Sequence, residues 1–168
     1  MNISEAASFL DRKIPDPKKG LPEEVFLFIA GITPMVNVDL LIKDEKGRTL
    51  LAWRDSAYTE KGWHLPGGII RFKETFAERL KKVAQNEIGT EVKFDPKPLA
   101  VNEIILEQKT RGHFISFLFK CFLSGEFIPP NRGLKETDAG YLKWHNTCPK
   151  SLLSVHQKLY RKYINLTR

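Results

Sequence analysis

Cysteine is scarce in this chain: only Cys121 and Cys148 occur among 168 residues, and they do not form a CxxC pair. This scarcity excludes a cysteine-based zinc site and a disulfide framework. Long apolar runs are also missing, and the first residues, MNISEAASFLDRK, lack the apolar segment of a signal peptide. We therefore expect a cytoplasmic protein without a membrane-spanning segment.

Blocks of like charge and internal repeats are missing as well, since no five consecutive like charges occur. What remains is an ordinary globular composition, with 42% hydrophobic and 28% charged residues. A chain of 168 residues is long enough for one domain with a sizeable core. The net charge of +7 indicates anionic ligands, either phosphorylated metabolites or nucleic acid.

Residues 1–34 predict a helical arm that precedes the main domain. Met1–Leu10 has the composition of a short helix, and Pro15–Pro22 is a linker. Glu23–Ala30 directly follows a proline and begins with two acids, which is typical of a helix start. The arm either packs on the domain or mediates a homodimer, and the sequence leaves both open.

Residues 35–168 alternate strand and helix patterns. Val36–Lys43 and Arg48–Arg54 flank the turn Asp44–Gly47 and predict a hairpin. Further on, the sequence predicts an antiparallel strand pair, a last strand and a C-terminal helix at Leu99–Leu106, Phe114–Leu123, Tyr141–His145 and Ser151–Asn165. The expected fold class is α/β, with one mixed sheet flanked by helices.

The stretch from Trp63 to Thr90 combines a strand end, a glycine loop and a helix. Gly67 and Gly68 follow the strand signal and allow a sharp turn or a close approach to a ligand. Thr75 and Glu78 have capping-box spacing, which predicts that a helix begins there. Gly89 is placed where a helix ends.

At these residues the sequence resembles the Nudix hydrolases, whose box runs G-x5-E-x7-R-E-U-x-E-E-x-G-U, with U apolar. The positions in register are Gly68, Glu74, Ala84, Glu87 and Gly89. The positions that differ are Lys82, Val83, Asn86 and Thr90. A box that keeps only the last helix acid resembles the GDP-mannose mannosyl hydrolase branch. The resemblance implies a Nudix α/β/α sandwich and cleavage of a nucleoside diphosphate linked to a sugar.

The box also implies a magnesium site, with Mn²⁺ as the alternative ion. A carbonyl of Gly67 and the carboxylate of Glu87 are oxygen ligands of the kind that Mg²⁺ prefers. Because Val83 has no ligating atom and Asn86 offers only an amide, we expect one helix-bound cation. The alternative is that Glu87 is a solvated carboxylate. Glu74 is interpreted as a structural partner of Lys82.

The resemblance carries further roles to residues outside the box. Asp39, within an apolar strand, and Arg54, at a strand end, match active-site residues of the mannosyl hydrolase branch. Their alternative roles are a carboxylate bonded inside the sheet and a solvated charge. His113 matches a histidine of that branch. The other expected substrate contacts are Gly68, inside the box, and Arg111, whose positive charge lies in a loop where a nucleotide could lie. A solvated loop is the alternative for Arg111.

The general base is not matched, because residues 135–140 contain no histidine where the branch has one. Glu136 or Asp138 is the carboxylate expected to take that role. His145 lies beyond this loop, on the strand. Attack at phosphorus would then be the more natural chemistry.

Three functions follow in order of preference. The first is a magnesium-dependent hydrolase of a nucleoside diphosphate linked to another moiety, such as the nucleotide sugar GDP-mannose. The second is a catalytically silent Nudix domain that binds a nucleotide or a protein partner. The third, hydrolysis at a nucleic acid end, rests on net charge alone, so nucleic acid is the least favoured partner.

Overall fold

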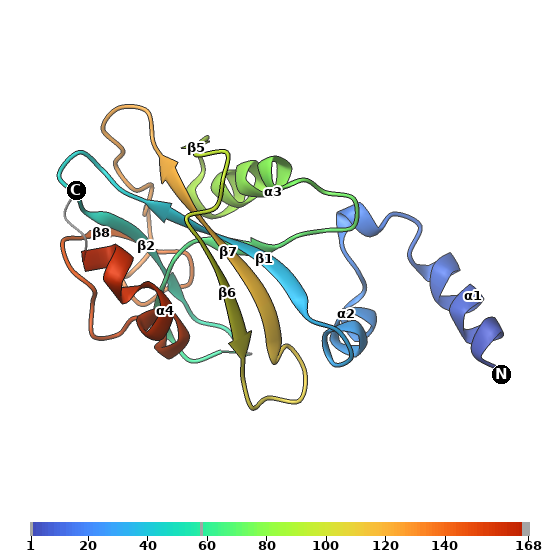
Figure 1. Ribbon diagram of the computed structural model, residues 1–168. Coiled ribbons are helices and arrows are strands. Elements are labelled where there is room, and N and C mark those ends of the chain that lie inside the picture. Colours follow the sequence, from blue (N-terminus) through green and yellow to red (C-terminus); the bar gives the residue numbers. More distant parts are fainter. Residues whose placement is uncertain (1, 58, 166–168) are drawn as a thin grey trace.

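A computed structural model describes residues 2–57 and 59–165 of the chain (Figure 1). In chain order its helices and strands are α1 (Ile3–Lys13), η1 (Pro17–Lys19), α2 (Glu23–Ala30), β1 (Met35–Ile42), β2 (Thr49–Arg54), β3 (Gly62–His64), β4 (Gly67–Ile69), α3 (Phe76–Val83), η2 (Ala84–Ile88), β5 (Lys93–Phe94), β6 (Ala100–Ile105), β7 (His113–Phe122), β8 (Leu142–His145) and α4 (Ser154–Asn165). Here η1 is a 3-10 turn and η2 is a π-helical turn.

The strands form two sheets. In the larger one the order is β4-β1-β7-β5, and β6 also pairs with β7. The β1–β7 contact is parallel and the others are antiparallel, so the larger sheet is mixed. The smaller sheet has the order β3-β2-β8. The predicted α/β class is therefore confirmed, but the strands form two sheets, of which the larger is mixed, and not the one mixed sheet that the sequence predicted.

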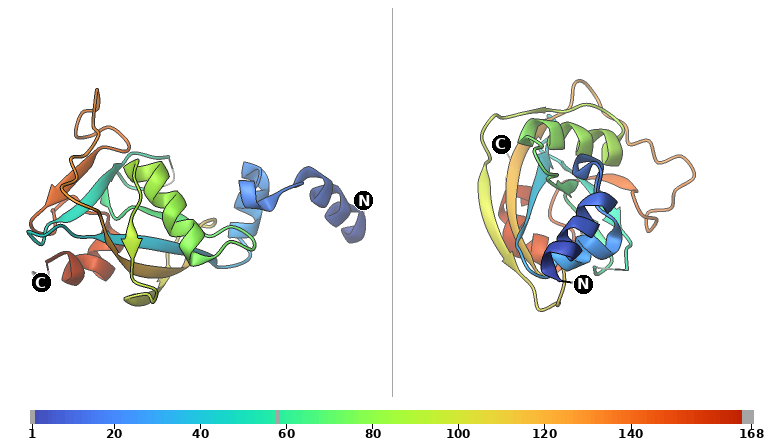
Figure 2. Two further views of the ribbon diagram at one scale, coloured as in Figure 1. Left: turned by 90° about the horizontal axis from the view of Figure 1, so that it is seen from above. Right: turned by 90° about the vertical axis from the view of Figure 1, so that its right-hand side faces the viewer.

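Alternate residues along the strands face two separate cores. Leu40 and Ile42 of β1 pack in one core with α3, whereas Leu41 packs in the other with α4. The same alternation splits Leu50 from Leu51 in β2. Because successive side chains of a strand point to opposite faces, α3 and α4 cover opposite sides of the strands. The views in Figures 1 and 2 show this α/β/α layering.

The expected hairpin between β1 and β2 forms only at its turn. Lys43 and Thr49 are bridged, and the Asp44 N–H bonds to the Arg48 carbonyl. Beyond that point the two strands pair with different partners in different sheets. The long antiparallel pair expected downstream does form, since β6 and β7 pair from Ala100 to Ile105.

The expected glycine loop is instead a short edge strand. Gly67–Ile69 pairs antiparallel with β1, and Asp39 lies opposite Gly67. A side chain at Gly67 would collide with the Asp39 carboxylate. A Cβ at Gly68 would lie 2.9 Å from the Val83 side chain. Glycine is needed here because neighbouring groups approach closely, and not because the chain turns.

The box helix begins as predicted and ends differently. Thr75 and Glu78 form both hydrogen bonds of a capping box. Gly89 ends the helix in the left-handed conformation, at a φ of 79°. However, its N–H bonds to the Ala84 carbonyl, so the last turn is a π turn instead of an α turn. Such turns often mark functional sites, and this one carries Glu87.

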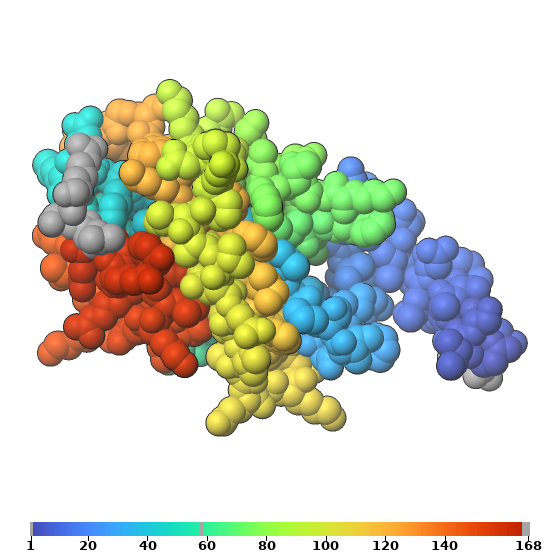
Figure 3. Space-filling view, viewed as in Figure 1, coloured from blue at the N-terminus to red at the C-terminus, as the bar shows by residue number. Residues whose placement is uncertain are grey.

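The N-terminal arm has two parts that contact the body to different extents. Helix α1 buries none of its residues and extends away from the sheets (Figures 1 and 3). Helix α2 lies against the body, where the Arg111 N–H bonds to the Ala30 carbonyl. Among the helices formed by residues 2–57 and 59–165, none has the length and apolar character needed to cross a membrane.

A buried polar network joins α4 to the centre of the larger sheet. The carboxylate of Asp39 accepts a hydrogen bond from the Tyr160 hydroxyl at 2.6 Å. It also accepts bonds from the Ser116 hydroxyl and, at 3.3 Å, the Asn37 amide. All three donors meet the same oxygen, Oδ2, and Asp39 is only 4% exposed. This bonding matches the structural alternative stated for Asp39, and it leaves Oδ1 on the Gly67 side.

We expect Tyr160→Phe to destabilise the fold by about 1–3 kcal/mol, because it removes one donor from a buried carboxylate. Burial and the neighbouring Asp39 raise the pKa of Tyr160, so its hydroxyl stays a donor across the usual pH range. Urea denaturation measures the change. Tyr163→Phe, in the same helix but outside the network, is the matched control and should cost much less. Equal losses for the two variants would contradict the role given to this hydrogen bond.

Candidate active site

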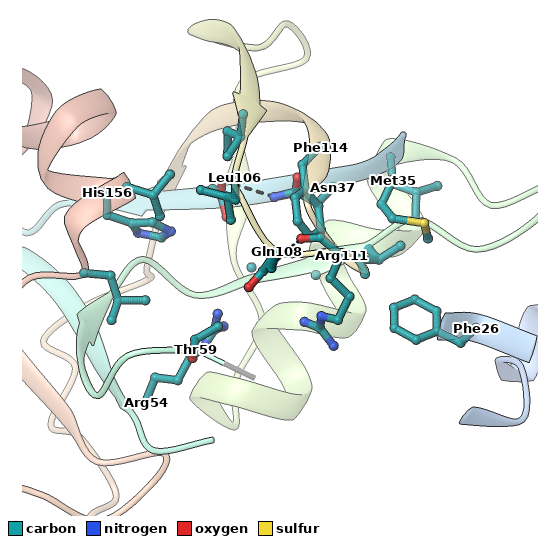
Figure 4. Close-up of a pocket in the computed structure, with 18 of the residues that line it drawn as sticks. Phe26, Met35, Asn37, Arg54, Thr59, Leu106, Gln108, Arg111, Phe114 and His156 are labelled. Carbon is teal, nitrogen blue, oxygen red and sulfur yellow. Dashed lines mark hydrogen bonds between the residues drawn. The ribbon is translucent and has the colours of Figure 1, made fainter. Parts of the chain in front are cut away.

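A cavity of about 990 Å³ lies beside the glycine strand. At one end Arg54 of β2 and His156 of α4 face it (Figure 4). Phe26 of α2 and Arg111, from the loop between β6 and β7, form the other end (Figure 4). The cavity therefore brings together β2, β4, α4 and the N-terminal arm. The arm was expected only to pack or to dimerise, so its place in the wall is a finding of the structure.

The N–H and C=O groups of Gly67 point toward the free edge of the larger sheet, away from β1. Leu40 N–H bonds to the Pro66 carbonyl and Ile70 N–H to the Val36 carbonyl. In an antiparallel pair this spacing turns the N–H and C=O of Gly68 toward β1 and those of Gly67 toward the free edge. The carbonyl of Gly67 is thus available as a ligand. Gly68 lines the cavity without a free backbone donor.

Glu87, in the π turn, lies next to Gly67. Burial raises its pKa to about 7, although the charge of Arg54 and a backbone hydrogen bond with Gly67 oppose the rise. The nearby carboxylate of Asp39 adds to the rise. A partly buried carboxylate beside an outward carbonyl is a pair of hard oxygen donors. Glu87 and Gly67 are therefore the groups that could hold a divalent cation.

The rest of the box helix adds no charged ligand to this pair. Val83 is 3% exposed and packs in the core, with its side chain directed at Gly68. Asn86 is exposed. Within the described part of the chain, no group of three or more acidic, histidine or cysteine side chains could hold a metal ion. The donors present therefore fit one cation better than several.

Glu74 has the structural role that the sequence predicted, with one additional partner. Lys82 Nζ lies 2.8 Å from its Oε1, as expected. Arg79, which the sequence did not single out, contacts Oε2 through both Nε, at 2.7 Å, and Nη2, at 2.5 Å. The N–H of Arg71 also bonds to Oε2. These contacts fix the segment between β4 and α3.

Arg54 lies close enough to three titratable groups for its charge to shift their pKa values. Besides acting on Glu87, it lowers the pKa of both His64 and His156. Figure 4 shows its side chain directed into the cavity. The structure therefore brings together Arg54, Asp39, Gly67 and Glu87, since the first three all act on the Glu87 carboxylate.

Two buried histidines beside this cluster were missed by the sequence reasoning. Burial lowers the pKa of His64 well below its usual value and that of His156 to about 4, so both are neutral. Nδ1 of His64 donates to the Leu65 carbonyl at 2.7 Å, and Nδ1 of His156 accepts from the Leu65 N–H at 3.2 Å. In the sequence, His156 has the position of a residue on the apolar side of the C-terminal helix. Its position in the cavity depends on the packing of α4.

Arg111 is part of the cavity wall and is not a solvated loop residue. It has a positive φ of 56°, and the Gln108 amide bonds to its carbonyl at 2.7 Å. Its guanidinium lies over the Phe26 ring, 5.4 Å from the centroid. The predicted substrate contact therefore has a suitable position.

His113, in contrast, does not line this cavity. It precedes Phe114, which does, and neighbouring residues of a strand face opposite sides. Its Nε2 lies 3.6 Å from a carboxylate oxygen of Glu103, on the outer face. The predicted substrate contact through His113 does not agree with this placement.

The two carboxylates expected as bases are also outside the cavity wall. Glu136 is exposed and pairs with Lys143 at 2.8 Å. Asp138 accepts a hydrogen bond from the Lys135 N–H and closes a turn. His145 packs its ring against Trp63, with 4.5 Å between the centroids. The loop conformation, which the sequence did not predict, turns the two acids away.

Comparison with known proteins agrees with the fold. The model of the NUDIX domain family matches residues 33–161, so the chain belongs to the Nudix family. The chain is also similar to the low-salt glycan biosynthesis protein Agl8 of Haloferax volcanii. The two are 32% identical over 143 residues, which cover 75% of this chain and 91% of that protein.

Solved structures show the same fold. A MutT NUDIX hydrolase from Burkholderia pseudomallei superposes with a TM-score of 0.57 at 22% identity, covering 75% of this chain and 95% of that one. A NUDIX family hydrolase from Clostridium perfringens gives 0.58 at 15% identity, with coverage of 80% and 98%. At these identities the likeness extends to the fold alone.

The raised pKa of Glu87 predicts a pH-dependent gain from Glu87→Gln in metal-free protein. The folded pKa of about 7 exceeds the ordinary 4.5, so wild-type stability is lost as pH rises from 4.5 through 7. Relative to wild type, the variant should gain little near pH 4.5 and on the order of 3 kcal/mol above pH 7. Denaturation with a chelator present, at several pH values, measures the gain.

Glu91→Gln, which changes an exposed carboxylate shortly after the same helix, is the control and should show no such trend. A Glu87→Gln gain that does not change with pH would contradict the raised pKa of Glu87.

Proposed function

We propose that this Nudix protein is a magnesium-dependent hydrolase of a nucleoside diphosphate linked to another moiety. A nucleotide sugar such as GDP-mannose is the favoured class. The observation that carries the proposal is the carboxylate of Glu87, held next to the outward-facing Gly67 with Arg54 close by. One carboxylate, one carbonyl and one arginine suit a diphosphate that is both metal-bound and hydrogen-bonded.

The cavity supports a substrate larger than a simple phosphate. About 990 Å³ is at the upper end of the range for small-molecule sites. Its walls combine Phe26 and Phe114 with Arg54 and Arg111, which suits a ligand with both ring and phosphate groups. The name of the Haloferax volcanii relative, a glycan biosynthesis protein, favours a sugar-linked nucleotide.

Each site residue has a distinct part in this proposal. A divalent cation, when bound by Glu87 and Gly67, would neutralise charge on the diphosphate. Arg54 would donate hydrogen bonds to the same group as charge develops on it. Asp39, fixed by the Tyr160 hydroxyl, would hold the wall opposite Gly67 and present Oδ1 toward it. We do not place the base at Glu136 or Asp138, because Glu136 is exposed and paired with Lys143 and Asp138 closes a turn with Lys135, and neither lines the cavity.

A catalytically silent Nudix domain that binds a nucleotide is the second candidate. It is favoured by Val83 and Asn86, which replace two helix acids, and by the absence of a histidine from residues 135–140. Calorimetry with a nucleoside diphosphate, at high protein concentration and with product analysis, separates the two. Binding without any product would favour the silent domain.

We expect Arg54→Gln to reduce magnesium-dependent turnover of a nucleotide sugar by roughly 10²–10³-fold, since it removes a donor to developing charge. A panel of nucleotide sugars, nucleoside triphosphates and dinucleotides, each with and without magnesium, is the assay. Arg132→Gln, at an exposed loop residue outside the cavity wall, is the control and should keep full activity. Absence of magnesium-dependent turnover across the panel would refute the hydrolase proposal.

The bond that breaks is determined by running the reaction in water labelled with oxygen-18. Label in the phosphate product identifies attack at phosphorus. Label in the sugar identifies attack at carbon, as in the mannosyl hydrolase branch.

A further inference from the structure

An arginine occupies the helix face that lies against the glycine strand. Arg79 and Val83 are four residues apart on α3 and therefore share a face. Both approach Gly68: a Cβ there would lie 2.9 Å from Val83 Cγ2, 3.5 Å from Arg79 Cδ and 3.9 Å from Arg79 Nη1. The face that meets Gly68 thus presents an apolar group and a cation, and no carboxylate.

The side chain of Arg79 is nine-tenths buried, and its ion pair with Glu74 involves only two of its three guanidinium nitrogens. Its side chain is 9% exposed, and its Nε and Nη2 both bond to Oε2 of Glu74. Its Nη1 has no hydrogen-bond partner among residues 2–57 and 59–165, and it is not sealed from solvent. Arg79 lines the cavity together with Gly67 and Gly68, and its Nη1 lies 3.9 Å from the position of a Cβ at Gly68, so Nη1 is next to the glycine strand.

Glu74 does not fully neutralise the charge of Arg79, because it also pairs with Lys82. Glu74 is 2% exposed and also pairs with Lys82 at 2.8 Å and accepts from the Arg71 N–H at 2.9 Å. Two cations therefore share one carboxylate, which leaves about one net positive charge in the cluster. Lys82 is 53% exposed and does not line the cavity, so the buried excess charge lies on the cavity side, at Arg79.

We propose that Arg79 binds a phosphate group of the ligand directly, through Nη1, in the space next to Gly68. A carboxylate at position 83 would place a second cation in that space; here the guanidinium supplies the positive charge itself. Arginine suits this task because its planar fork can hold Glu74 on one side and phosphate oxygens on the other. The identity of the full substrate rests on the proposed function, but the phosphate contact does not.

The test is calorimetric binding of inorganic pyrophosphate at pH 7 with a chelator present, so that no divalent cation takes part. Wild type should bind pyrophosphate, and Arg79→Met should weaken binding at least tenfold. Lys82→Met removes the other cation that pairs with Glu74 but does not alter the cavity wall. It is the matched control and should stay within about twofold of wild type.

Two further variants separate phosphate binding from stability. Arg79→Met leaves Glu74 with a weaker partner set, so the double variant Glu74→Gln/Arg79→Met restores the charge balance. It should fold, as measured by thermal melting, and still bind at least tenfold more weakly. Arg79→Lys keeps the charge but not the fork, and should bind more tightly than Arg79→Met and less tightly than wild type.

The inference is overturned if wild type does not bind pyrophosphate without metal. It is also overturned if Arg79→Met or the double variant binds as wild type does, or if Lys82→Met weakens binding equally. A separate outcome concerns the proposed function: pyrophosphate binding that depends on Arg79, with no turnover of any nucleotide sugar, would refute the hydrolase and keep the phosphate subsite.

Discussion

The close approach of the box helix to the glycine strand is the constraint on which the candidate site depends. A side chain at Gly67 would collide with the Asp39 carboxylate, and one at Gly68 would press on Val83. With no side chains there, β4 can pair with β1 at the sheet edge while α3 packs against it. The pairing with β1 turns the Gly67 carbonyl toward the free edge, and the packing of the box helix brings Glu87 next to Gly67.

Charges of both signs meet at this contact. The helix supplies one partly buried carboxylate, Glu87, and one buried guanidinium, Arg79, which is held by Glu74. A guanidinium binds phosphate without an ion, whereas a carboxylate needs one. The contact between α3 and β4 can therefore offer positive charge in two forms, as an ion held by Glu87 and as the Arg79 guanidinium, and Arg54 adds a second guanidinium from β2. This combination fits a single-cation site in which arginines replace further metal ions.

Much of the fold followed from local sequence signals, because capping and periodicity depend on neighbours in the chain. Thr75, Glu78 and Gly89 gave the limits of the box helix, and the resemblance gave the cluster of Glu87, Gly67, Asp39 and Arg54. Contacts between segments that are distant in the sequence could not be predicted from such local signals. The cavity positions of His156 and Arg79, the role of the arm, and the outward turn of Glu136 and Asp138 all depend on tertiary packing.

The central claim is that one helix carboxylate holds one cation. Titration with Mn²⁺, followed by electron paramagnetic resonance of the free ion, measures the stoichiometry directly in the full-length protein. If Glu87 holds the cation, wild type binds one Mn²⁺ per chain and Glu87→Gln binds none over the same concentration range. Two or more ions per chain, or one ion that remains after Glu87→Gln, would contradict it.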